Sequence, residues 1–109
     1  MPTAYKVLGQ SNPAATTATT LYTVPAATET IVSTLTICNQ ASTAATYRIA
    51  VRPDGTSLAA QHYVAFDVSL PGNATDTLTL GITINASDVI TIYASTATMS
   101  FAAFGSELS

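Results

Sequence analysis

The chain has 109 residues, of which 48% are hydrophobic and only 8% are charged. This length is typical of one domain and leaves no room for a separate catalytic domain, so we expect a single domain over residues 1–109. Six acidic and three basic residues give a net charge of −3. That is too little positive charge for nucleic-acid binding through phosphates or for attachment to an anionic membrane surface.

The low charge content is the main anomaly of the composition, because globular proteins usually contain about 25% charged residues. Thr, Ser and Ala can solvate a surface without charge, but a neutral surface also suits one that neighbouring proteins cover. We expect the covered surface. The start MPTAYKVLGQ lacks the apolar stretch of a secretion signal, and no apolar run is long enough to cross a membrane. These features predict synthesis in a reducing cytoplasm.

Polar and apolar residues alternate with period two along the whole chain, which predicts β-strands. In chain order, the predicted strands are residues 5–8, 19–24, 30–38, 45–52, 61–70, 76–84, 88–94 and 98–105. Turn residues separate them, most clearly in the run RPDG at 52–55. Eight short strands at about ten-residue spacing predict an all-β, single-domain antiparallel β-sandwich, either a jelly roll or immunoglobulin-like.

The alternation also assigns side chains to faces. In the third predicted strand it places Ile31 on the same face as Leu35 and Ile37. In the fifth predicted strand it places Tyr63 and Asp67 on the face opposite the core. The core face of that strand is predicted to carry His62, Val64, Phe66, Val68 and Leu70.

Residues for catalysis are few. The single histidine, His62, is predicted to pack at the core face, and Asp67 falls on the other face of its strand. A nucleophile–base pair of Cys38 and His62 has no identifiable third group to orient it. The acidic residues are spread one per region without the spacing of an EF-hand, although a calcium site made by loop oxygens stays an alternative. We therefore predict no catalytic residue, no cofactor and no metal ion, and so not an enzyme.

Tyrosine and arginine side chains are the candidates for a partner interface. Tyrosine offers area, rigidity and a hydrogen bond, which suits an interface, but a strand tyrosine can equally fill a cross-strand pair. Two arginines on one strand face can bridge to carboxylates of a neighbouring subunit or can simply be solvated. The predicted partner-interface residues are Arg48, Arg52, Tyr63 and Tyr5.

Five segments, in this order and spacing, carry a resemblance to a known family: LYTVPAATETIVSTLTICNQ, YRIAVRPDG, HYVAFDVSL, LTLGITINASDVITIYAS and FAAFGSEL. Together they span Leu21 to Leu108. The chain resembles small virion structural proteins of tailed phages, many of which infect cyanobacteria. The resemblance implies residence in a virus particle, without catalytic residues and without fixing the part of the particle.

Two positions in a particle fit this resemblance. The short chain favours a decoration or cement protein on the head lattice, bound to the major capsid protein. The alternative is a tail, baseplate, fibre or neck component, which can include a module that binds host glycans. The absence of tryptophan disfavours a glycan site, because such sites need an aromatic platform. Partners are expected to be other virion proteins, and further copies of the chain, with a trimer favoured.

Overall fold

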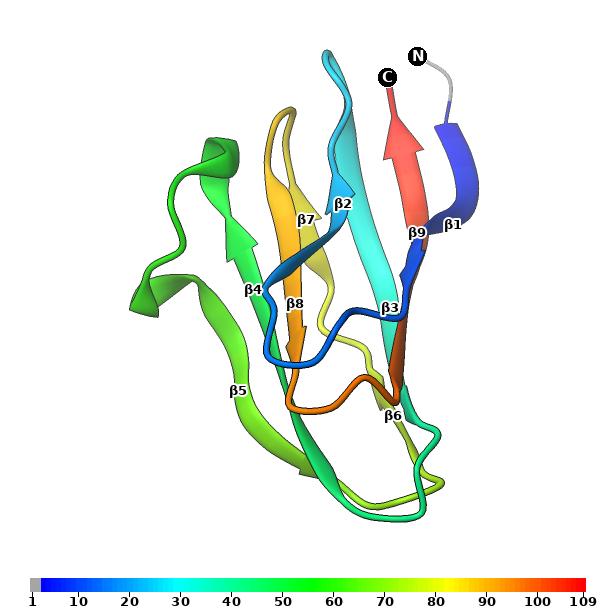
Figure 1. Ribbon diagram of the computed structural model, residues 1–109. Coiled ribbons are helices and arrows are strands. Elements are labelled where there is room, and N and C mark those ends of the chain that lie inside the picture. Colours follow the sequence, from blue (N-terminus) through cyan, green and yellow to red (C-terminus); the bar gives the residue numbers. More distant parts are fainter. Residues whose placement is uncertain (1–2) are drawn as a thin grey trace.

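The computed structural model describes residues 3–109 and has an all-β architecture (Figure 1). Two short 3-10 turns, η1 (Pro53–Gly55) and η2 (Ala60–His62), lie between the fourth and fifth strands. The described part of the chain holds nine strands: β1 (Thr3–Ser11), β2 (Thr19–Thr23), β3 (Glu29–Asn39), β4 (Ala45–Arg52), β5 (Tyr63–Leu70), β6 (Thr75–Leu78), β7 (Ile82–Ile84), β8 (Val89–Ala94) and β9 (Met99–Leu108).

The strands form two antiparallel sheets that pack face to face as a sandwich, as predicted. Sheet A has the order β1-β9-β3-β6, and β7 also pairs with β3; sheet B has the order β2-β8-β4-β5. Both β6 and β7 pair with β3, one after the other along its length, so together they occupy one strand position in the sheet. Counting them as one gives the orders 1-8-3-6 and 2-7-4-5, which is the topology of a jelly roll.

The predicted strand 76–84 is interrupted, which explains nine strands in place of eight. Gly81 has a positive φ of 63°, and residues 79–81 lie outside the ladder. A positive φ turns the backbone out of the extended conformation that a strand requires. The other strand positions were predicted correctly, with small differences at the ends.

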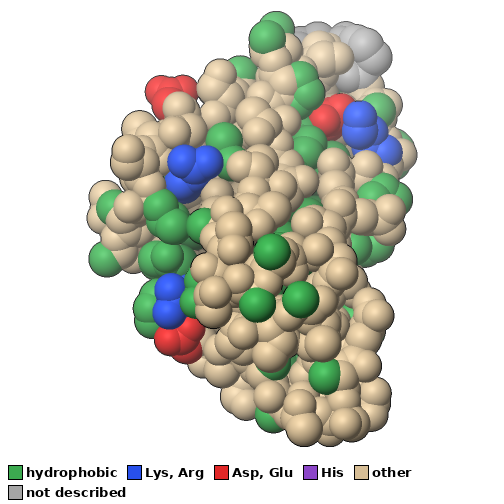
Figure 2. Space-filling model, viewed as in Figure 1, with side chains coloured by type: hydrophobic (Ala, Val, Ile, Leu, Met, Phe, Trp, Pro, Cys, Tyr) green, Lys and Arg blue, Asp and Glu red, His purple; other side chains and the backbone are tan. Residues whose placement is uncertain are grey.

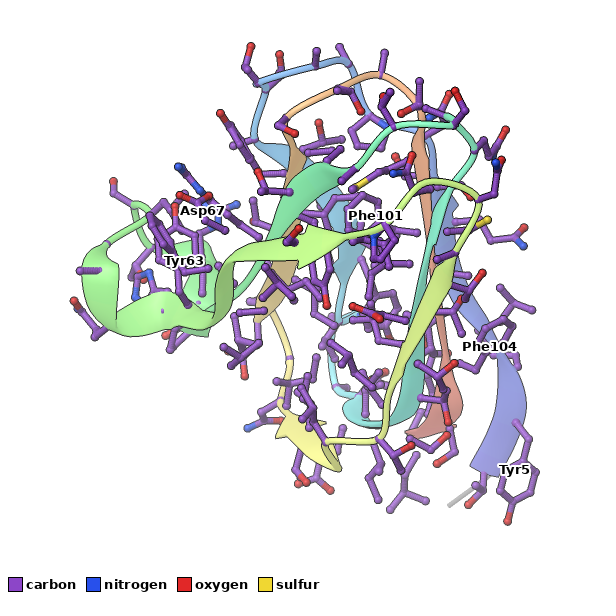
Figure 3. The ribbon with its side chains drawn as sticks, turned by 90° about the horizontal axis from the view of Figure 1, so that it is seen from below. Tyr5, Tyr63, Asp67, Phe101 and Phe104 are labelled. Carbon is purple, nitrogen blue, oxygen red and sulfur yellow. The ribbon has the colours of Figure 1, made fainter. Side chains whose placement is uncertain are left out.

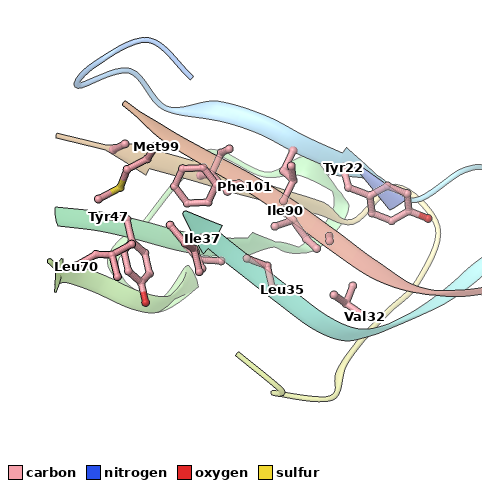
Figure 4. Close-up of a cluster of buried hydrophobic side chains, with 14 of the residues drawn as sticks. Tyr22, Val32, Leu35, Ile37, Tyr47, Leu70, Ile90, Met99 and Phe101 are labelled. Atoms are coloured by element: carbon pink, nitrogen blue, oxygen red, sulfur yellow. The ribbon is translucent and has the colours of Figure 1, made fainter. Parts of the chain in front are cut away.

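The core lies between the two sheets (Figure 4). The Tyr47 and Phe101 rings meet edge to face with centroids 6.3 Å apart, and both side chains are fully buried. Burial of each large apolar side chain contributes about 1.5–3 kcal/mol, so this layer supplies most of the folding free energy. The largest fully buried apolar side chains are Tyr47, Phe101, Leu35, Ile37, Ile49, Leu70, Ile90, Ile92 and Met99.

A bulge in β3 reverses one predicted face. Val32 pairs with Gly105 and Thr34 with Phe104, so Ser33 is an extra residue on β3. Each extra residue in a strand reverses the alternation beyond it. Val32 therefore faces the core together with Leu35 and Ile37, and the prediction that Ile31 shares their face is wrong.

Strand β5 is irregular in the same way. Tyr47 pairs with Val68 but Ile49 pairs with Ala65, so three steps along β5 match two along β4. Asp67, whose φ is +51°, lies in the stretch that holds the extra residue. Val68 and Leu70 face the core as predicted, but the expectation that Val64 and Phe66 do so is wrong, because both are exposed. His62 is buried, and its Nδ1 accepts a hydrogen bond of 3.0 Å from the Ala59 N–H.

Candidate protein-interaction surfaces

The outer face of sheet B carries a compact group of five side chains, called here the Arg48 cluster: Arg48, Tyr63, Phe66, Asp67 and Tyr93. The Arg48 guanidinium lies between two rings, 4.2 Å from the Phe66 centroid and 4.3 Å from the Tyr93 centroid. The ring of Tyr63 meets that of Phe66 edge to face, with centroids 4.9 Å apart. Such contacts fix aromatic and guanidinium groups in one arrangement before any partner arrives.

Asp67 completes the cluster by binding the guanidinium through both carboxylate oxygens. Arg48 Nε donates to Oδ1 at 2.6 Å and Nη2 donates to Oδ2 at 3.3 Å. The hydrogen bond that Arg48 donates to Asp67 raises the pKa of Arg48. The positive φ of Asp67 belongs to the β5 bulge, and bulges commonly re-aim a side chain. Here the bulge turns Phe66 and Asp67 onto the face that Arg48 occupies.

Arg52 lies on the same strand as Arg48 but holds the turn that follows β4. Its Nε donates to Thr91 Oγ1 at 3.0 Å, and its Nη1 donates to the Thr56 carbonyl at 3.1 Å. Of the four predicted interface residues, the structure therefore brings only Arg48 and Tyr63 together. Tyr5 lies on the other side of the sandwich (Figure 3).

The second surface, the Tyr5 face, is the outer face of sheet A around Tyr5, Val7, Ile31 and Phe104. Residues opposite each other in a ladder share a face, and Tyr5, Ser106, Ile31 and Thr83 follow one another across β1, β9, β3 and β7. Val7 and Phe104 are paired in the neighbouring row. Tyr5 is 85% exposed and Ile31 is 51% exposed, so the face presents apolar groups to solvent.

A network of polar side chains on the inner side of sheet A anchors β1. Lys6 Nζ lies 2.9 Å from Glu107 Oε1, and the Tyr22 hydroxyl donates to Glu107 Oε2 and contacts Thr30 Oγ1 at 2.8 Å. The hydrogen bonds from Tyr22 and then Lys6 lower the pKa of Glu107. Burial, followed by the hydrogen bond to Glu107, raises the pKa of Tyr22 to about 12. Lys6 is thus engaged within the chain, and its charge does not project from the Tyr5 face.

Across residues 3–109, no three His, Cys, Asp or Glu side chains lie close enough to hold a metal ion. Every buried side-chain nitrogen and oxygen in this part of the chain has a hydrogen-bond partner, so none is left aimed at an absent ligand. None of the described helical segments has the length and apolar character needed to cross a membrane. Charged side chains are scattered and few on the face that Figure 2 shows.

Reasoning from the sequence missed Phe66, Asp67 and Tyr93 in the first surface and Ile31 and Phe104 in the second. Strict alternation assigned Phe66 and Ile31 to the core, and only the bulges expose them. One signal was available, since Asp67, which directly follows Phe66, is a poor strand residue.

No protein-family model, curated protein or solved structure matches this chain. The residues themselves must therefore carry any proposal about function.

Proposed function

We propose that this chain is a structural protein of a tailed-phage particle, namely a decoration or cement protein on the head lattice, and that it binds a neighbouring virion protein through the Arg48 cluster. The observation that carries the proposal is that the Arg48 guanidinium is held between the ring of Tyr93 and the exposed ring of Phe66. The resemblance of the sequence to virion structural proteins supports a location in a phage particle. The jelly roll is also the fold of many viral capsid domains.

The composition of the Arg48 cluster is that of a binding hot spot. Arginine and tyrosine are enriched among the residues that dominate interface energies. Because neighbouring rings and Asp67 already fix the guanidinium, a partner does not have to order it, which removes one of the costs of association. Val64, on the same strand β5, is exposed as well.

A cement protein acts by binding a surface that exists only in the assembled shell. Binding to the assembled state alone stabilises that state over separated subunits by mass action. Each contact can be modest, since many copies act together on one lattice. The low charge of the chain fits this role, because covering neutral Thr, Ser and Ala side chains leaves no buried charge without a partner.

Cryo-electron microscopy of the purified particle tests the proposal. Density for this jelly roll on the outer capsid lattice, with the Arg48 cluster at the contact, is the expected result. Particles that lack the protein should then release DNA at a lower temperature, and addition of the purified chain should restore the temperature. Absence of the chain from the particle would overturn the proposal.

Two variants on one strand separate the cluster from its surroundings. Arg48→Ala should weaken binding to depleted particles by more than about tenfold, as expected for a hot spot. Arg52→Ala removes the same kind of side chain from the same face, four residues further along β4, and should leave binding nearly unchanged. Equal losses for both variants would contradict a specific role for the cluster.

A tail component that binds host glycans is the second candidate, because Asp67 lies beside an aromatic group, a set of residues that sugar sites use. Against it, the Arg48 guanidinium already covers one face of the Phe66 and Tyr93 rings. Density confined to the tail, together with glycan-array binding that Phe66→Ala abolishes, would favour this candidate over the first.

A further inference from the structure

The Tyr5 face exposes several apolar side chains on sheet A, and they have no partner of the kind that Arg48 gives to Phe66. Tyr5 and Val7 on β1 and Ile31 on β3 are exposed, and Phe104 on β9 lies half-buried between them. Contiguous exposed apolar side chains of this kind mark interaction sites. Figure 3 shows Tyr5 and Phe104 on the side of the sandwich away from Tyr63 and Asp67.

This face contains both a projection and a groove. The Tyr5 ring is 85% exposed, and next to it lies an open groove of about 440 Å³. The larger side chains that line the groove are Tyr5, Ile31 and Phe104. The other lining residues are the small residues Ser33, Gly105 and Ser106, and Lys6, whose charge is paired with Glu107. The projecting ring and the groove that can receive a ring are therefore side by side on one surface.

The face is also almost free of charge. In the ladder rows that form it, among the described residues, Glu29 at one end of β3 is the only charged side chain. A charged partner surface would lose hydration here without gaining an opposite charge. The same face of a second copy is equally neutral, and it brings the ring that the groove can receive.

The edges of sheet A argue for contact through the face and not for strand addition. On one side, β1 carries Lys6 and a bulge between Val7 and Gly9. On the other side, the break at Gly81 divides the edge into the short strands β6 and β7. Edge lysines, bulges and short strands are the devices that prevent pairing between sheets.

We propose that a second copy of this chain covers the Tyr5 face, related by a two-fold axis, with the Tyr5 ring of each copy packed over the groove of the other. Projection and groove on one face make the contact isologous, which closes at two copies, whereas a three-fold ring needs two different surfaces. This proposal favours a dimer over the trimer that the sequence analysis favoured. This inference does not depend on the role in a virus particle.

The size of the face sets the strength of the dimer. The whole outer face of sheet A, with four strand positions about 4.8 Å apart and about 30 Å long, covers at most about 600 Å² per copy. Two copies would bury about 1,200 Å², the lower end of the range for specific interfaces. We therefore expect a concentration-dependent dimer and not an obligate one.

Sedimentation velocity from about 1 µM to about 1 mM tests the proposal. The Cys38→Ser background removes the single thiol, so no disulfide can create a dimer. The chain should move from monomer to dimer across this range. Tyr5→Glu and Ile31→Glu should each raise the dissociation constant by at least about tenfold, because each buries a charge without a partner. Circular dichroism of each variant monitors its fold.

Val64→Glu is the matched control, because Val64 is similarly exposed but lies on β5 in sheet B. It should leave the dissociation constant unchanged. The proposal is overturned by a monomer at every concentration, by a trimer, or by a dimer that Val64→Glu disrupts and the folded Tyr5→Glu and Ile31→Glu variants do not. Loss of the dimer with particle binding retained, or the reverse, separates this inference from the proposed function.

Discussion

The two outer faces of this sandwich expose aromatic side chains in different ways. On sheet B, Phe66 is exposed but packed against Arg48 and Tyr63, and Arg48 is bound by Asp67. On sheet A, Tyr5 is more exposed than Phe66, and it belongs to a neutral patch around a groove. The side chains of the first surface are held in place by one another, whereas those of the second surface have no such contacts.

The difference shows that exposure alone does not define an interaction surface. A residue with partners in its own chain contributes to folding as well as to binding, so its substitution changes both. A residue without them contributes to binding alone. Substitutions on the two faces should therefore separate stability from association, in an order that the contacts predict.

The largest effect is expected at Gly105, which lies beneath the Tyr5 face. A Cβ atom there would come within 2.0 Å of the Ile31 carbonyl oxygen. Because that atom belongs to the backbone of β3, it cannot rotate away, and Gly105→Ala should lower the free energy of unfolding by about 1–3 kcal/mol or more. Urea denaturation measures the loss. The neighbouring change Ser106→Ala should cost less than about 0.5 kcal/mol, and equal costs would contradict the close approach.

An intermediate effect is expected for the Arg48 cluster. Arg48→Ala should lower Tm by a few degrees, since it removes two stacking contacts and the bond to Asp67. Arg48→Lys keeps the charge but loses the planar group, and it should lower Tm almost as much. If lysine restores the full Tm, charge alone holds the cluster together and the stacked arrangement is unimportant. Thermal unfolding followed by circular dichroism decides between these results.

The network of polar side chains that anchors β1 predicts a smaller effect on stability, and this effect depends on pH. The lowered pKa of Glu107 means that its stabilising contribution is present above its ordinary value of 4.5 and is lost as pH falls through the folded value. The raised pKa of Tyr22 means that its contribution is present below 10 and is lost as pH rises toward about 12.

Unfolding measured across pH tests both limits. Glu107→Gln should flatten the acid limb, and Tyr22→Phe should flatten part of the alkaline limb. An acid limb that is unchanged in Glu107→Gln would show that another carboxylate governs it.

The smallest effect on stability is expected at Tyr5 itself. Tyr5→Ser should change the free energy of unfolding by less than about 0.5 kcal/mol, since the ring is 85% exposed. The protein concentration in this measurement should be well below the dissociation constant of the dimer, because association would itself stabilise the folded chain. A loss above about 1 kcal/mol would show that Tyr5 packs within its own chain, and the contrast between the two faces would fail.

Much of the fold could be predicted from the sequence because strands announce themselves locally. The alternation in residues 45–52 predicted β4 with its observed bounds, and Tyr47 and Ile49 are buried in that strand. The break at Gly81 was not predicted, since a glycine within a strand pattern is compatible with an uninterrupted strand. Strand order was also left open, because it depends on pairing between distant segments.

The candidate surfaces were less predictable, for one physical reason. A bulge is a property of two strands, set by how β3 fits β9 and how β5 fits β4. Period-two reasoning treats each strand alone, so it placed Ile31 and Phe66 in the core. Arg48 and Tyr63 were found because their residue types are typical of interfaces. Their three companions in the cluster depended on the register.

The break between β6 and β7 gives the molecule a position for engineering. No atom lies within 4 Å of a Cβ built on Gly81, and the neighbouring Leu80 is exposed. Exposed tips without packed neighbours accept added sequence readily. A peptide epitope inserted between these two residues would project from the sheet edge without entering the core, which makes this small jelly roll a candidate scaffold for peptide display.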